Sequence, residues 1–335
     1  MPGALRVRVV RSAEELSPGL DALVSASGAP FYFGREFLAA YEHYPVQAVA
    51  DRYYLEVYDA EDELLGFAPC HVQADPLGAL GLAPGETALV SNLWHCPDSH
   101  LVAVQRRPEV AAALLAAMGR CAAEAGLTRY GFVNVEVGSP SAAALEAAGL
   151  AGTPIDKRYA LDLSSFSTED DYLATLSGST RHEYRRQLRR AAEAGAEMSM
   201  RTATAHEEAE RFRLLEISAA RFGSAGYYDA QRIVDFLGMM QKAARINEIR
   251  LDGELLAIGI LFAEDRKLHT WAAGYDRERE LPFSPYYLLH ASAVRYAFEL
   301  GLPVLEGGRR NDDFKMRFGM AQKPLAAYLG PDERS

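Results

Sequence analysis

The chain has 335 residues, of which 49% are hydrophobic and 24% charged, and its formal net charge is −11 at pH 7. This composition is that of an ordinary globular protein, long enough for two cores of roughly 150 residues each. It contains no apolar run near the roughly 18 residues of a membrane span, and its acidic charge disfavours non-specific binding to DNA. Its three cysteines are too few and too irregularly spaced for a disulfide framework or a zinc site, which favours a cytoplasmic location.

The first half of the chain alternates between strand-like and helix-like patterns. Ser12 follows the first strand-like run and can cap a helix, and Pro45 stops the second amphipathic helix. The expected elements, in chain order, are a strand at 5–10, a helix from about 13, a helix at 35–44, a hairpin at 51–72, a strand at 88–94, a helix at 111–125 and a strand at 130–135.

The segment 156–167 is expected to cross over into the second half and to contain its first strand, around Tyr159. A helix then opens at Thr168 with acidic residues in its first turn. A basic helix follows and stops at Gly195. The expected elements are that basic helix at 180–194, helices at 214–222 and 230–244, a hairpin at 245–262, a strand at 268–273, a helix at 286–300 and a strand at 303–306.

The two halves share the same order of elements. The hairpin at 51–72 has a counterpart at 245–262, where Asp252-Gly253 supplies the turn signal. In each half a helix then ends in Gly-Leu, at Gly126 and at Gly301, and leads into a strand. The spacing is too long for a solenoid and indicates a duplicated domain. We therefore predict an α/β protein with two similar domains, 1–160 and 161–335, each a mixed, mainly antiparallel sheet flanked by helices.

The segment 311–319 is the strongest candidate for chemistry. It combines acids, bases and aromatics directly after Gly307-Gly308, where the chain can reverse sharply. A lysine held there, Lys315, could stabilise a developing oxyanion or bind phosphate. Glu306, at the end of the preceding strand, is a candidate general base. The alternative is a solvated hairpin whose charges pair with one another.

Two motifs resemble the FemABX-like transferases, tandem members of the GNAT superfamily. One is the strand followed by a loop and Phe314-Lys315, two residues and Phe318-Gly319; the other is the basic helix at 179–195. The resemblance implies two GNAT-like domains, an acyl- or aminoacyltransferase activity, a catalytic role for Lys315 and no metal or redox cofactor. It also links the basic helix with phosphate. The expected donor- or phosphate-binding residues are Arg181, Arg185, Arg189, Arg309 and Arg310.

An acceptor pocket is expected from a further set of side chains. For the aromatic members the alternative is core packing, and for His95 and Asp98 it is a plain loop. The segment 95–100 contains metal-capable ligands, but no second pair accompanies them, so we expect no metal site. The expected pocket residues are Trp271, Tyr275, Asp313, Phe314, His95 and Asp98.

The acyl donor is suggested by the absence of glycine from one loop. GNAT enzymes that use acyl-CoA usually carry a glycine-rich loop that holds pyrophosphate with backbone amides, whereas the corresponding loop 276–285 has no glycine and two prolines. We therefore expect aminoacyl-tRNA as donor, with acyl-CoA as the alternative, and an amine, hydroxylamine or hydroxyl of a small-molecule or peptide-like acceptor. A non-catalytic binding module and a nucleic-acid-binding protein that uses the arginine helix remain rival hypotheses.

Overall fold

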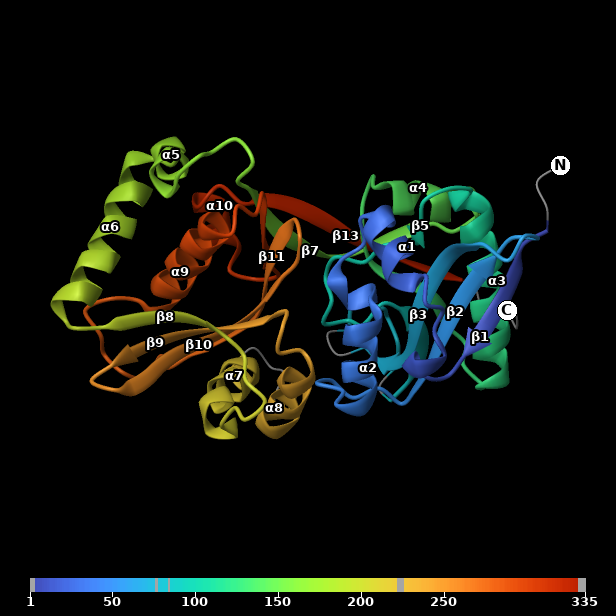
Figure 1. Cartoon of the computed structure of the whole chain (residues 1–335), viewed down its shortest axis with the longest axis horizontal. Helices are drawn as coiled ribbons and strands as arrows, with labels where there is room; N and C mark the ends of the chain where they lie inside the picture. Colours follow the sequence, from blue (N-terminus) through green and yellow to red (C-terminus); the bar gives the residue numbers. More distant parts are fainter. Residues whose placement is uncertain (1–3, 76–77, 84, 222–225, 331–335) are drawn as a thin grey trace. The chain divides into compact units, whose positions relative to one another are not determined.

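The computed structural model describes residues 4–75, 78–83, 85–221 and 226–330, and it contains two compact units (Figure 1). Unit 1 is Met1–Arg158 with Lys323–Ser335, and unit 2 is Tyr159–Gln322. The boundary expected at 160 therefore lies two residues from the division. The expected range 161–335 was too long, because the chain from Lys323 onward packs with unit 1.

Unit 1 is a sheet with the strand order β1–β2–β3–β4–β6–β13–β7, in which β5 also pairs with β3. Neighbouring strands are antiparallel from β1 to β4, whereas β4 and β6 are parallel. The elements are β1 (Arg6–Val10), α1 (Leu20–Ser27), α2 (Arg35–His43), β2 (Asp51–Tyr58), β3 (Leu64–Ala74), β4 (Thr87–Ser91), β5 (Val102–Ala103), α3 (Arg107–Glu124), β6 (Tyr130–Glu136), α4 (Pro140–Ala147), β7 (Gly152–Asp162) and β13 (Ala321–Gly330).

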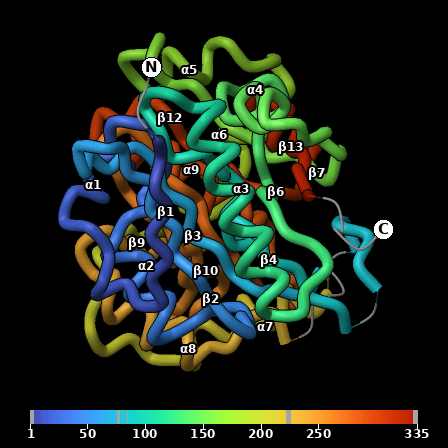
Figure 2. Tube along the Cα trace, turned by 90° about the vertical axis from the view of Figure 1, so that its right-hand side faces the viewer, coloured from blue at the N-terminus to red at the C-terminus, as the bar shows by residue number. Residues whose placement is uncertain are grey.

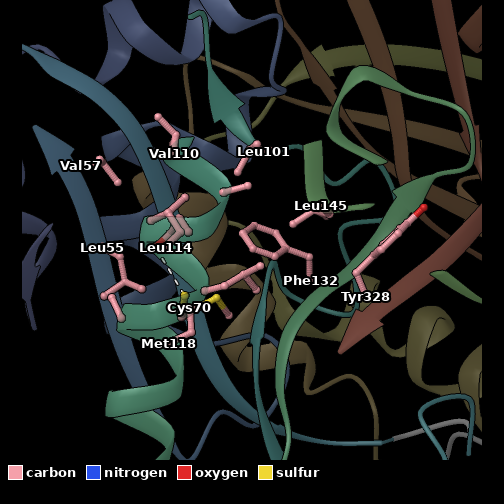
Figure 3. Close-up of a cluster of buried hydrophobic side chains, with 14 of the residues drawn as sticks. Leu55, Val57, Cys70, Leu101, Val110, Leu114, Met118, Phe132, Leu145 and Tyr328 are labelled. Carbon is pink, nitrogen blue, oxygen red and sulfur yellow. Dashed lines mark hydrogen bonds between the residues drawn. The ribbon is translucent and has the colours of Figure 1, made fainter. Parts of the chain in front are cut away.

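One face of this sheet is covered by α3, which lies along β2, β3 and β6 (Figure 2). Its residues Leu114 and Met118 pack with Phe132 of β6, Leu145 of α4 and Tyr328 of β13 in a buried hydrophobic core (Figure 3). The core thus joins a C-terminal strand to elements from the first half of the chain, and this contact explains why β13 is part of unit 1.

In unit 2 the strands follow the order β7–β12–β11–β10–β9–β8. The pair β11 and β12 is parallel, and the other pairs from β12 to β8 are antiparallel. The elements are α5 (Glu169–Thr175), α6 (Gly178–Glu193), β8 (Glu197–Thr202), α7 (Ala209–Arg221), α8 (Ala230–Met239), β9 (Ala244–Leu251), β10 (Glu254–Ala263), β11 (Lys267–Tyr275), α9 (Pro285–Glu299), β12 (Val304–Gly308) and α10 (Asp312–Arg317).

Helices lie on both faces of the strands of unit 2. The helices α5, α6 and α9 lie on one side of the strands and the pair α7 and α8 on the other (Figure 1). The hairpin β9–β10 turns at Asp252-Gly253, both with positive φ, as the sequence predicts. The α/β class with mixed, mainly antiparallel sheets and flanking helices is confirmed.

Several local predictions were wrong. The strand expected around Tyr159 is part of β7, but β7 begins earlier, at Gly152, so residues 156–158 belong to a strand and not to a crossover. The strand β8 and the helix α4 were not predicted, and the helix expected at 230–244 ends at Met239. Residues 312–317 form the helix α10 rather than a turn. β7 and β8 obtain their hydrogen bonds from strands distant in sequence, so local pattern gives little sign of them.

Candidate active site

Lys315 lies on α10, directly after a turn in which Arg310 and Asn311 have left-handed backbone conformations. Its side chain is only 3% exposed, so the alternative of a solvated hairpin is wrong for this residue. Nζ donates hydrogen bonds to the carbonyl oxygens of Gly308 at 3.1 Å and Arg309 at 2.5 Å. The ammonium also lies 5.4 Å from the centre of the Tyr159 ring. A buried cation is therefore held in one place by backbone dipoles and an aromatic face.

Glu306 supports the same turn from the end of β12. It is 2% exposed, and its Oε1 accepts a hydrogen bond from the backbone N–H of Gly308 at 3.1 Å. Its carbonyl oxygen accepts from Oγ1 of Thr270 in β11 at 2.9 Å. These contacts fix the carbonyl groups that bind Lys315. The general-base role of Glu306 stays a prediction.

The two parallel strands next to this turn pair over a short stretch only. β11 and β12 are in register from Lys267 to His269, opposite residues 304–306. β11 then continues to Tyr275, where α7 lies against it: the Tyr275 amide donates to Ser218 Oγ at 3.2 Å. A Cβ on Gly274 would lie 2.3 Å from the Leu214 carbonyl oxygen, so the backbones of β11 and α7 are in close contact.

Phe314 is the centre of an aromatic cluster beside Lys315. Its ring centre is within 5.3 Å of each of its four ring neighbours, three of which are on α9. Tyr275 extends the cluster through its contact with Tyr286 at 5.8 Å. We call this set the aromatic cluster; it comprises Tyr275, Tyr286, Tyr287, His290, Phe314 and Phe318. The predicted pocket residues Tyr275 and Phe314 are thus joined through Tyr286.

His290 is a polar member of this cluster that the sequence analysis missed. It is buried on α9, and burial, followed by the nearby charge of Lys315, lowers its pKa from 6.5 to about 3. Its Nε2 is buried and has no hydrogen-bond partner. The only sequence signal is a lone histidine in an apolar helix, a pattern more typical of core packing.

Two other predicted pocket residues have different surroundings. Trp271 is 9% exposed and stacks on Phe236 of α8 at 5.6 Å, with Phe262 edge-on at 5.4 Å. These contacts are those of core packing, the alternative that the sequence left open. Asp313 lies on α10 next to Phe314, and its side chain is exposed.

The arginines of α6 fall into two groups. Arg181 donates to the carbonyl oxygens of Ala174 and Leu176, at 2.7 and 2.9 Å, and so caps the C-terminal end of α5. Arg185 and Arg189 form only long, exposed ion pairs, with N–O distances of 3.8 and 3.7 Å. Arg185 and Arg189 are therefore exposed cations of α6, while Arg181 has a structural role.

The remaining arginines of the prediction lie beside Lys315. Arg309 is partly buried and supplies one of the two carbonyl acceptors of Lys315. Arg310 is exposed in the left-handed turn. Arg309 and Arg310 thus belong to the turn that directly precedes α10, the helix that carries Lys315.

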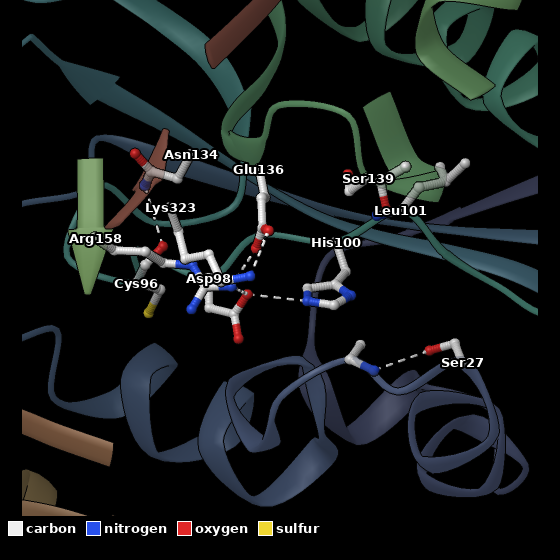
Figure 4. Close-up of polar contacts among 12 residues, drawn as sticks. Ser27, Cys96, Asp98, His100, Leu101, Asn134, Glu136, Ser139, Arg158 and Lys323 are labelled. Atoms are coloured by element: carbon white, nitrogen blue, oxygen red, sulfur yellow. Dashed lines mark hydrogen bonds and ion pairs between the residues drawn. The ribbon is translucent and has the colours of Figure 1, made fainter. Parts of the chain in front are cut away.

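In unit 1, Asp98 belongs to a chain of ion pairs (Figure 4). Its Oδ1 binds Arg158 at 2.8 Å and His100 at 3.1 Å, and Arg158 continues to Glu136 at 2.8 Å. Lys323 of β13 binds the other oxygen of Glu136 at 3.1 Å. Asp98 is 1% exposed, so this carboxylate joins the loop to β6, β7 and β13. His95 is partly buried in the same loop.

Within the residues that the structure describes, three or more histidine, cysteine or acidic side chains nowhere gather as metal ligands would. No described helix combines the length and apolarity needed to cross a bilayer.

A family model matches most of unit 2. Residues 178–316 match the acetyltransferase (GNAT) domain. The match begins with α6 and ends in α10, one residue after Lys315, so it includes both the basic helix and the Phe-Lys motif. No curated protein matches the chain in sequence.

Solved structures share the fold of the whole chain. FemX matches with a TM-score of 0.65 at 13% identity, covering 96% of this chain and 97% of FemX. A tandem GNAT protein from the clavulanic acid biosynthesis pathway matches with a TM-score of 0.59 at 15% identity, covering 99% of this chain and 100% of that one. L-PGS from Bacillus licheniformis matches with a TM-score of 0.58 at 14% identity, covering 95% and 93%. The chain thus contains a match to the acetyltransferase (GNAT) domain over residues 178–316, and over nearly its whole length it shares the fold of FemX and of a tandem GNAT protein.

Proposed function

We propose that this acyltransferase moves an aminoacyl group from aminoacyl-tRNA to an amine, hydroxylamine or hydroxyl of a small-molecule or peptide-like acceptor, in the cytoplasm. The observation that carries the proposal is the ammonium group of Lys315, buried at 3% exposure and fixed by two carbonyl oxygens next to Phe314. A fixed cation in a site that excludes water stabilises negative charge far better than one in solvent.

The reaction forms one bond and breaks another. The acceptor nitrogen or oxygen attacks the carbonyl carbon of the aminoacyl ester, and the carbonyl oxygen gains negative charge that Lys315 stabilises. The ester bond to the ribose then breaks. The acceptor loses one proton, and the leaving ribose oxygen gains one, so no net proton is consumed. Glu306 is the predicted base that carries this proton, and a water molecule is the alternative carrier.

The N-terminus of α9 supports tRNA rather than acyl-CoA as donor. In a GNAT enzyme that holds pyrophosphate, backbone amides at this position must be available. Here the amide of Ser284 donates to Oε1 of Gln187 at 2.6 Å, and Pro285 has no N–H. The outer face of α6, with Arg185 and Arg189 exposed, suits a long polyanion instead.

Acetyl-CoA is the second candidate donor, because the family model that matches residues 178–316 is an acetyltransferase domain. The test is mass spectrometry after incubation of the protein with a pool of charged tRNAs or with acetyl-CoA, using a panel of amines and hydroxyl compounds as acceptors. Aminoacylated products that need wild-type protein and disappear with Lys315→Met support the proposal. Acetylated products alone replace tRNA by CoA, and absence of any product with either donor contradicts both.

A further inference from the structure

His290 carries a buried polar atom that the fold leaves without a partner. The residue is 9% exposed, and its Nε2 has no hydrogen-bond partner among the described residues. Leaving a buried donor or acceptor unpaired is unfavourable by an amount comparable to a lost hydrogen bond, and native structures contain few such groups. This unpaired atom belongs to a ring that contacts Phe314, the residue directly before the candidate catalytic Lys315, and this position points to a role in binding.

The surroundings of the ring define what could pair with it. The apolar rings of Phe314 and Phe318 make T-shaped contacts with the His290 ring. Their centres lie 5.3 and 4.7 Å from the centre of the imidazole. Lys315 is close enough for its charge to lower the pKa of His290. A cationic ligand group would be repelled here. A carbonyl oxygen, which becomes negative during acyl transfer, would be attracted by both residues.

The backbone that carries His290 is firmly held. Nδ2 of Asn247 in β9 donates to the carbonyl oxygen of Leu289 at 3.0 Å, which fixes this turn of α9 on the sheet. The unpaired atom is therefore on a rigid element, as a preorganised site requires.

We propose that His290 is a catalytic residue that donates a hydrogen bond from Nε2–H to the carbonyl oxygen of the acyl donor, next to the ammonium of Lys315. This inference rests on the proposed acyl transfer and deepens it. A neutral imidazole has one N–H, so it can act as a donor without adding charge. With its pKa near 3, His290 stays neutral at physiological pH. It therefore polarises the carbonyl and does not act as the general base.

The first experiment compares three variants in the transfer assay. His290→Phe keeps a ring and removes the nitrogen, and kcat should fall about a hundredfold, the effect of losing one oxyanion donor, with little change in KM. His290→Gln places an amide N–H near the position of Nε2 and should recover part of kcat. His290→Asn places it nearer the position of Nδ1 and should not. The pH profile of His290→Gln between pH 5 and 9 should keep the wild-type shape.

The second experiment observes the nitrogen directly. Wild-type protein labelled with ¹⁵N-histidine is titrated with puromycin, whose aminoacyl amide on an adenosine imitates the charged end of tRNA, and separately with acetyl-CoA. The Nε2–H signal of His290 should shift with the probe that binds. This measurement needs no turnover, so it stands even where His290→Phe folds poorly.

The outcomes separate the two proposals. Turnover of His290→Phe equal to wild type, or a bound probe that leaves the Nε2–H signal unchanged, overturns the role of His290 and leaves the acyl transfer intact. Wild-type protein that binds neither probe and turns over neither donor overturns the proposed function, and the role of His290 with it.

Discussion

The hydroxyl of Tyr172 in α5 donates a hydrogen bond to the carbonyl oxygen of Phe318, 2.8 Å away and 146 residues later in the chain. Phe318 follows the last residue of α10, and its ring packs against Tyr184 of α6 at 5.8 Å. The C-terminal end of the helix that carries Lys315 is therefore anchored by α5 and α6, independently of the lysine side chain.

Replacement of Lys315 by methionine removes the charge and keeps most of the aliphatic stem. We expect kcat to fall by at least about a hundredfold, equivalent to roughly 3 kcal/mol of transition-state stabilisation. Since Gly308 and Arg309 also lose a donor, the free energy of unfolding should fall by about 1–3 kcal/mol, while the anchor at Phe318 keeps the helix folded. Steady-state kinetics and chemical denaturation measure the two effects.

The matched control is Lys242→Met, an exposed lysine of the same unit, which should change neither quantity. Lys315→Arg should restore activity poorly, because a planar guanidinium does not reproduce a compact ammonium. Wild-type turnover by Lys315→Met would show that the lysine only holds the turn.

The arginines of α6 should separate into structural and binding residues. Arg181→Ala removes the cap on α5 and should lower the free energy of unfolding by about 1 kcal/mol. The double variant Arg185→Ala/Arg189→Ala should leave stability nearly unchanged, because both side chains are exposed. It should weaken binding of tRNA and reduce the slope of log K against log salt by about 2.

Salt titrations of tRNA binding and urea denaturation of each variant provide the measurements. An unchanged salt slope in the double variant would exclude the outer face of α6 as the polyanion contact.

His290 should also make the stability of the protein depend on pH. Its pKa is about 3 in the folded protein and near 6.5 when unfolded, so below pH 6.5 the unfolded state binds more protons. The free energy of unfolding therefore keeps the whole contribution of the neutral His290 above pH 6.5, and it loses this contribution as the pH decreases towards 3. Between pH 7 and pH 5 this group alone should account for about 2 kcal/mol.

His290→Phe should lose that part of the pH dependence, so its stability relative to wild type should rise as the pH falls. The exposed His182→Gln is the control and should follow the wild-type curve. Parallel curves for His290→Phe and wild type would mean that the imidazole already titrates near its ordinary value in the folded protein.

Gly274 allows α7 to lie against β11. A methyl group there would meet the Leu214 carbonyl oxygen at 2.3 Å, so Gly274→Ala should destabilise unit 2 by about 1–3 kcal/mol. The control is Gly238→Ala in α8, where the nearest atom is 3.7 Å away and alanine should stabilise the helix by about 0.5–1 kcal/mol. Thermal unfolding distinguishes the pair, and a neutral Gly274→Ala would require α7 to shift without loss of packing.

The duplicated hairpins, the helix–Gly-Leu–strand units and the basic helix could be predicted because their signals are local. Apolar alternation and turn residues such as Asp252-Gly253 specify a hairpin within about twenty residues. The position of Lys315 next to Phe314 was visible as a motif. Its burial was not, because the carbonyl groups that bind it are brought to it by the left-handed turn at Arg310 and Asn311.

The features that sequence could not supply depend on contacts between distant segments. Arg181 resembles its neighbours on α6, and only the nearby end of α5 gives it a different role. In the sequence, Asp98 is an ordinary acidic residue of a polar loop. Its ion pair with Arg158 of β7 exists only in the folded protein. His290 is distinguished only by the missing partner of Nε2, a property of the packed structure.

The pairing of β13 with β6 has a consequence for synthesis on the ribosome. Unit 1 receives this strand only after the whole of unit 2 has been translated, which at usual elongation rates takes on the order of ten seconds. During that time the β6 edge that β13 will occupy is open. A fragment that stops near residue 160 would keep this open edge permanently. Nascent chains would thus be most exposed to chaperones and to misassociation just before the final strand emerges.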